Sequence, residues 1–174
     1  ILLVVGFNLQ TYSKLKGDAP SINLAGSQRM RTFKISFYTT RYVVTGSLDY
    51  KELVETEIAQ FEKITTGLTQ GDRELNLSGV KEETAVNILQ EARGLWEGYK
   101  EKVNSILNSP TPGKLADLDS SSLELAGKFD ELTNELDRLS QGNTRSATLV
   151  SYIALSLAFV IVFVALRLII NIIK

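Results

Sequence analysis

The feature that most constrains the fold is a repeat of apolar residues at alternating spacings of three and four. It is clearest between residues 115 and 139, where every repeat position but one is apolar. A period of 3.5 residues is typical of a helix that packs along one face against other helices. The repeat positions are Leu115, Leu118, Ser122, Leu125, Phe129, Leu132, Leu136 and Leu139.

Two earlier segments carry the same repeat, over residues 54–68 and 85–106. We therefore expect both to form helices that bury these positions. Trp96 and Tyr99 fall on the second repeat, so core packing is a better explanation for them than a ligand cage. The positions are Val54, Ile58, Phe61, Thr65 and Leu68, then Ala85, Leu89, Ala92, Trp96, Tyr99, Val103 and Ile106.

Turn-forming residues separate the repeats. We expect Asp49 to cap the helix that follows Gly46 and Ser47, and Ser78 or Gly79 to begin the next helix after a polar loop at 69–79. The stretch 108–113 holds two prolines and a glycine and marks a further break.

The first helix is expected to begin at Asp18, as its N-cap, with Pro20 in the first turn, and to end at Gly46. From Ile22 this helix carries two overlapping stripes of mostly apolar residues. A helix with two such faces usually packs on two sides, so we expect one face to meet its own bundle and the other a partner subunit. The stripes are Gly26, Met30, Phe33, Phe37, Thr40 and Val44, and Ile22, Gly26, Arg29, Phe33, Ser36, Thr40 and Val43.

Two apolar stretches indicate a membrane. Residues 147–166 contain no charge, and their length matches a bilayer crossing. A buried helix of a soluble protein is the alternative. The stretch 1–12 is apolar but too short to cross, and we interpret it as the last turns of a truncated transmembrane helix, with a buried amphipathic N-terminus as the alternative.

Together these patterns predict an all-α fold, an antiparallel four-helix bundle whose first and fourth helices continue as transmembrane helices. The predicted boundaries are residues 1–13 for the end of the first transmembrane helix, 14–146 for the bundle domain and 147–174 for the second transmembrane helix. Such a domain, looped out between two membrane helices, is suited to moving one helix against another.

Composition excludes most catalytic chemistry. The chain has no cysteine and no histidine, which removes thiolate nucleophiles, disulfides, Ser–His–Asp triads and zinc sites that need these residues. It also lacks a P-loop, a dinucleotide-binding glycine motif and a paired-carboxylate signature. We therefore expect no enzyme activity, no catalytic residue, no metal and no cofactor. The net charge of −1 gives no general attraction to nucleic acid.

Positive charge gathers on the first helix. Residues 1–48 hold one acid, Asp18, and six basic residues. Arg29 lies on a stripe expected to pack, where a guanidinium needs an acid or a bound anion because an unpaired buried charge is costly. Pairing with Asp130 or Glu135, or exposure at the bundle rim, is the alternative to a ligand. The six are Lys14, Lys16, Arg29, Arg31, Lys34 and Arg41.

The same stretch carries a family resemblance. Residues 18–33, DAPSINLAGSQRMRTF, resemble the P-box of bacterial nitrate/nitrite sensors, within the wider family of type IV pili transducer-like (PilJ-type) sensor domains. The matching features are the Asp-Ala start, Ile22-Asn23, Ala25-Gly26-Ser27 and Arg29-Met30. Weaker similarity extends to about residue 145.

The resemblance implies a periplasmic four-helix sensor domain of a receptor in the bacterial inner membrane. It implies a homodimer that holds nitrate or nitrite at its two-fold axis, with Arg29, Gly26 and Ser27 as ligand-binding residues. Lys34 stands where these sensors often have a second arginine, which makes its role doubtful. A HAMP relay with a histidine kinase of a two-component system, or with a chemotaxis signalling region, would follow. The alternatives are a structural dimerisation or protein-interaction module, and a PilJ-type sensor of another small ligand.

Overall fold

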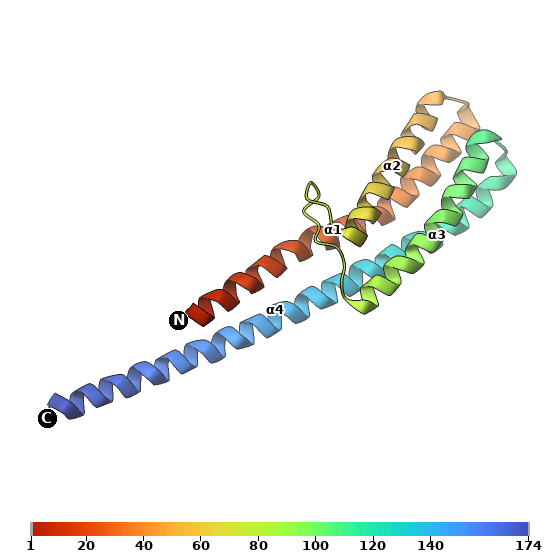
Figure 1. Ribbon diagram of the computed structural model, residues 1–174. Coiled ribbons are helices and arrows are strands. Elements are labelled where there is room, and N and C mark those ends of the chain that lie inside the picture. The colour runs from red at the N-terminus through yellow and green to blue at the C-terminus, as the bar shows by residue number, and fades with distance from the viewer. Residues whose placement is uncertain (1, 174) are drawn as a thin grey trace. The chain divides into compact units, whose positions relative to one another are not determined.

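The computed structural model describes the backbone from Leu2 to Ile173 and the side chains of residues 18–172 (Figure 1). Four long helices follow one another, α1 (Leu2–Thr45), α2 (Leu48–Gln70), α3 (Glu83–Asn108) and α4 (Leu115–Ile173), with a short 3₁₀ helix, η1 (Pro112–Lys114), before the last. This part of the chain contains no β-strand, and its one β-bridge joins Asp72 and Leu77. The all-α expectation is confirmed.

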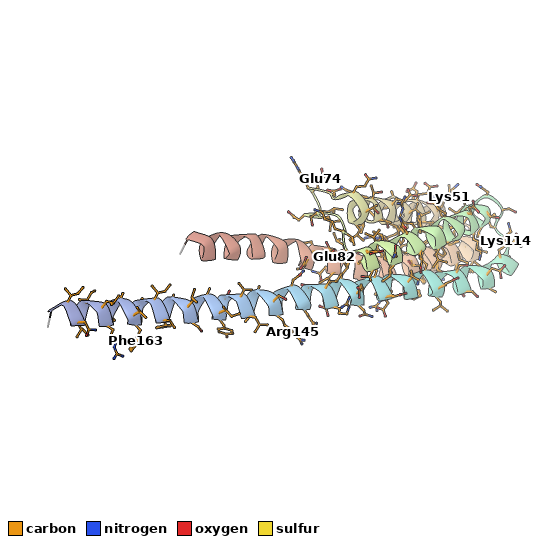
Figure 2. The ribbon with its side chains drawn as sticks, turned by 60° about the horizontal axis from the view of Figure 1, so that its bottom comes forward. Lys51, Glu74, Glu82, Lys114, Arg145 and Phe163 are labelled. Atoms are coloured by element: carbon orange, nitrogen blue, oxygen red, sulfur yellow. The ribbon has the colours of Figure 1, made fainter. Side chains whose placement is uncertain are left out.

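The chain divides into two compact units, residues 17–137 and residues 1–16 with 138–174. In the first unit, Figure 2 shows Lys51 and Lys114 at one end of the helices and Glu74 and Glu82 at the other. The turn at 46–47 and the break at 109–114 therefore share one end, and the loop after α2 lies at the opposite end.

The predicted core positions of α2, α3 and α4 are mostly confirmed. All seven repeat positions of α3 are buried, as are the six of α4 from Leu118 to Leu136 and four of the five of α2. Aromatic rings fill the centre, where Phe61 stacks on Trp96 with centroids 3.8 Å apart and meets the edge of Phe129 at 5.3 Å. These three helices were predictable because their buried faces are the apolar ones.

Neither of the two predicted stripes forms the buried face of α1. Among its buried residues only Ser36 belongs to a stripe, and the face is mostly small and polar. The apolar pattern therefore pointed to the wrong side of the helix. The buried residues are Ser21, Ala25, Gln28, Thr32, Ile35, Ser36 and Thr39.

Hydrogen bonds satisfy part of this buried polar face, whereas Gln28 Oε1 and Thr39 Oγ1 are buried without a hydrogen-bond partner in the structure. The Gln28 amide Nε2 donates to the Phe61 carbonyl and to Thr65 Oγ1, both at 2.8 Å. The Tyr99 hydroxyl donates to the Thr32 carbonyl at 3.0 Å. These hydrogen bonds offset part of the cost of burying polar groups, so α1 packs against α2 and α3 with a face that is mostly polar.

The expected start of the first helix is wrong. Asp18 does not cap a helix, because α1 runs without a break from Leu2 through Asp18 and Pro20 to Thr45. Pro20 has no N–H to donate to the Lys16 carbonyl, and the helix continues past this missing hydrogen bond.

The next two helix starts also differ from the expectation. Ser47 occupies the N-cap position of α2, with Asp49 inside its first turn. Helix α3 begins at Glu83 rather than at Ser78 or Gly79. The chain before α3 first folds back on α2, where the Val80 N–H donates to the Leu68 carbonyl at 2.8 Å.

The loop after α2 is more ordered than a polar sequence suggests. Asp72 and Leu77 exchange two backbone hydrogen bonds, of 2.9 and 2.8 Å, and Leu77 is buried. A methyl group at Gly67 would lie 2.8 Å from Leu77 Cδ1. The loop therefore packs onto α2 because Gly67 leaves room for Leu77.

The C-terminal apolar stretch forms part of α4. Among the described residues, one helical segment, Pro112–Ile172, is long and apolar enough to cross a membrane, and its most apolar part is not buried. The expected span 147–166 lies within it. For the other expected membrane segment, residues 1–13, the side chains lie outside the described residues.

Candidate functional site

The outward face of α1 is apolar. Four of its large apolar side chains are exposed to solvent, Met30 at 60%, Phe33 at 39%, Phe37 at 57% and Val44 at 68%. At about 100° per residue these positions, with Gly26, fall within about 60° of the helix circumference. They form one line, called here the outward stripe, on the side of α1 opposite its buried polar face.

Arg29 lies at the edge of the outward stripe that faces α4. Its Nη1 donates to Asp130 Oδ1 at 2.5 Å, and the two side chains are 52% and 50% exposed. The guanidinium is thus half exposed and paired with one of the two acids that the sequence offered as partners.

Lys34 lies at the other edge of the stripe. It follows Arg29 by five residues, which is about 140° around the helix. Lys34 Nζ lies 3.3 Å from Glu57 of α2, and Arg31 pairs with the same carboxylate. The structure therefore does not bring Lys34 to Arg29.

Gly26 lies on the stripe, one turn before Arg29. A methyl group at Gly26 would meet only Thr133 of α4, at 3.7 and 3.8 Å, which is ordinary van der Waals contact. A glycine inside a helix costs about 0.5–1 kcal/mol relative to alanine. The surroundings of Gly26 within the described residues give no steric reason for this cost.

Ser27 lies seven residues before Lys34 and so on the same edge of the stripe. Its hydroxyl donates to the Leu24 carbonyl at 2.7 Å, within its own helix. Of the four predicted site residues, the structure places Gly26 and Arg29 together and Ser27 and Lys34 together.

Glu57 is the residue that sequence reasoning missed. It lies on α2 and is the most buried side chain in the ion pairs that Arg29, Arg31 and Lys34 of α1 form, with 13% of it exposed. It stands three residues after Val54, at the margin of the α2 repeat. That position could have suggested a contact with a neighbouring helix, but only the register between α1 and α2 selects Arg31 and Lys34 as its partners.

The rest of the described residues hold little that could do chemistry. They contain no group of three or more acidic side chains placed to hold a metal ion. Burial raises the pKa of the Tyr99 hydroxyl, which stays protonated and serves as a donor in the core. The half-exposed guanidinium of Arg29 is the charged group at the α4 edge of the outward stripe.

Comparisons with known proteins bear on the family and the fold. The model of the PilJ family, described as the type IV pili methyl-accepting chemotaxis transducer N-terminal domain, matches residues 11–120. The ligand-binding domain of the P. aeruginosa nitrate receptor McpN is similar in fold, with a TM-score of 0.64 and 21% identity over 70% of this chain and 96% of that chain. No curated protein matches the sequence.

Proposed function

The chain belongs to the PilJ family of type IV pili methyl-accepting chemotaxis transducer N-terminal domains. From the resemblance of residues 18–33 to the P-box of nitrate/nitrite sensors, we propose that it senses nitrate or nitrite outside the cytoplasm. We infer that the ligand binds between two copies of the chain, at Arg29 and the backbone near Gly26. The observation that carries the proposal is the outward stripe of α1, which is apolar, exposed and bordered by Arg29.

The stripe supports a homodimer. Exposed apolar side chains in one line mark a surface that another molecule covers. In a two-fold dimer the stripe of one subunit meets the same stripe of the other. Met30 and Phe37 of each subunit would then be buried against the partner's stripe. Gly26 would let the two backbones approach closely, which explains a glycine that its own bundle does not require.

The same symmetry supports a bound anion. Arg29 would face its counterpart across the axis, and two guanidinium groups about 6 Å apart repel by roughly 3 kcal/mol at an effective dielectric constant near 20. A small planar anion between them removes the repulsion and accepts paired N–H donors. Lys34 is held by Glu57 on the other edge, so we assign it a contribution to the field and no direct contact.

Contacts between the helices support an antiparallel bundle. On α1, Arg29 and Ser36 pair with Asp130 and Asp119 of α4, in opposite sequence order. The α3–α4 contacts also run in opposite order, with Thr84 to Glu135 and Glu91 to Lys128. We infer that α1 and α4 leave the bundle at one end and continue as membrane helices.

The proposed topology keeps the boundaries expected from the sequence. Residues 14–146 form the periplasmic domain, and residues 1–13 and 147–174 belong to membrane helices in the bacterial inner membrane. A ligand that favours the closed dimer shifts the population towards it. Each α1 then moves slightly against its α4, and α4 transmits the shift to a chemotaxis region or to a histidine kinase.

Calorimetry on the 174-residue chain in detergent tests the site. We expect sodium nitrate to give a heat of binding and sodium chloride at equal ionic strength to give none. Arg29→Ala should abolish binding, whereas Arg41→Ala, with the same charge change further along α1, should retain it. Binding that survives in Arg29→Ala contradicts the site, and no nitrate heat in the wild type contradicts the ligand.

The Arg29–Asp130 pair favours a second function, a structural dimerisation or protein-interaction module. In that case Arg29 only links α1 to α4, and the outward stripe only joins subunits. Thermal unfolding separates the two functions, because a ligand stabilises the state that binds it. A melting temperature that follows ionic strength and not nitrate favours the module, and a response to a different small molecule favours a sensor of another ligand.

A further inference from the structure

Each cation of α1 between residues 18 and 40 already has an acidic partner from its own bundle. Arg29 pairs with Asp130, while Arg31 and Lys34 share Glu57. A small anion that approaches the outward stripe therefore meets no unpaired cation in this stretch. An anion that binds through Nη1 of Arg29 has to take the place of the Asp130 carboxylate.

The two acidic partners differ in how readily they can be replaced. Glu57 is mostly buried and holds two cations, so its release would leave a poorly solvated charge. Asp130 and Arg29 are each about half exposed, and water can solvate both when they separate. An exposed pair of this kind contributes up to about 1 kcal/mol, which corresponds to about a fivefold change in affinity.

We propose that Asp130 is an internal competitor that holds Arg29 until the anion replaces it. This inference rests on the proposed anion site at Arg29. Asp130 occupies Nη1 of a guanidinium whose planar fork is suited to binding two oxygens of one planar anion. The competitor sets a threshold, because the anion concentration needed for binding rises with the strength of the Arg29–Asp130 pair.

The exchange also changes how α1 is linked to α4. Asp130 is an α4 residue, so its replacement removes an ion pair between the two helices. The hydrogen bond from Ser36 to Asp119, of 3.1 Å, lies further along the same pair of helices and would remain. Anion binding at Arg29 would thus loosen α4 at one point of its contact with α1.

The test is a titration of the 174-residue chain in detergent with sodium nitrate. Asp130→Asn removes the charge with little change in shape, and we expect it to tighten binding by about threefold or more. Glu131→Gln is the matched control, because Glu131 is the next residue on α4 and pairs with Lys128 at 2.7 Å. It should leave the affinity unchanged, and Asp130→Glu should keep it near that of the wild type.

The possible outcomes distinguish this inference from the proposed function. Binding in the wild type that is equal or weaker in Asp130→Asn overturns the competitor and leaves the anion site standing. Equal tightening in Asp130→Asn and Glu131→Gln also overturns it, since net charge alone would then explain the effect. No nitrate binding in the wild type or in Asp130→Asn overturns both. Asp130→Ala repeats the measurement if circular dichroism shows that Asp130→Asn is misfolded.

Discussion

Contacts within the bundle account for Arg29 but not for Gly26, although the two residues lie one helical turn apart. Arg29 has a partner, Asp130, so its presence alone does not require a ligand. Gly26 has no such explanation, because a methyl group would fit beside Thr133. At the scale of single residues, Gly26 is therefore the more telling sign that another molecule approaches α1.

Replacing Gly26 by alanine should separate stability from binding. We expect Gly26→Ala to raise the free energy of unfolding of the undimerised chain by about 0.5–1 kcal/mol, because alanine favours the helix. The same change should weaken nitrate binding and dimer formation, because the added methyl group keeps the two α1 helices apart. Denaturant unfolding at low protein concentration and nitrate titration measure the two effects.

Gly127→Ala is the control for helix propensity. A methyl group at Gly127 of α4 would have no atom within 4 Å, so this variant should gain similar stability. Its nitrate affinity should equal that of the wild type. If Gly26→Ala binds nitrate as well as Gly127→Ala does, the close approach at Gly26 is wrong.

Among the elements, α1 is where sequence reasoning was weakest. For α2, α3 and α4 the apolar repeat and the buried face coincide, so the repeat gave most of the core. In α1 the buried face is mostly polar, and some of its hydrogen-bond partners, such as Phe61 and Tyr99, lie on other helices. Which residues become partners depends on how the helices pack, and the periodicity of a single helix carries no information on that packing.

The arrangement of the candidate site residues was likewise only partly predictable from the sequence. The helical spacing of Gly26 and Arg29 already places them one turn apart. The place of Lys34 on the far edge of the stripe also follows from its five-residue spacing from Arg29, but its pairing with Glu57 needed the register of α1 against α2. Asp130 could be named from the sequence as an acid within reach, but its choice over Glu135 came from the packing of α4.

Tyr99 gives a test of how α1 is held by its polar face. Tyr99→Phe loses the hydrogen bond to the Thr32 carbonyl and should cost about 0.5–1.5 kcal/mol at neutral pH. Burial raises the pKa of Tyr99 above its ordinary value of 10.0. The unfolded chain therefore loses a proton above pH 10 that the folded chain keeps, and stability falls as the pH rises.

The phenylalanine variant lacks this titration. The difference in stability between wild type and Tyr99→Phe should be greatest below pH 10 and should shrink as the pH rises above it. Thermal unfolding of both chains from pH 7 to 11 measures the difference, and other titrating groups cancel in it. A difference that stays constant with pH would show that Tyr99 ionises equally in the folded and unfolded states.

On the scale of the whole molecule, two apolar surfaces among residues 18–172 lack cover in one copy of the protein. The outward stripe of α1 is a narrow line bordered by charged side chains, which suits a second protein surface. The C-terminal part of α4 is apolar around its whole circumference, because the exposed Leu149, Ile161 and Leu155 lie about 120° apart around the helix. A helix that is apolar on every side suits lipid, whereas a one-sided stripe suits a partner.

The depth of α4 in a bilayer can be tested with one arginine placed at two positions. Leu157 lies near the middle of the expected span 147–166, and Leu149 lies near its start. An arginine at the centre of a membrane helix raises the apparent insertion free energy by about 2.5–3.5 kcal/mol, and near an end it can extend to the interface. We expect Leu157→Arg to impair insertion strongly and Leu149→Arg weakly, in an assay that measures the inserted fraction of the segment in microsomes. Equal effects at both positions would contradict a membrane crossing that is centred near Leu157.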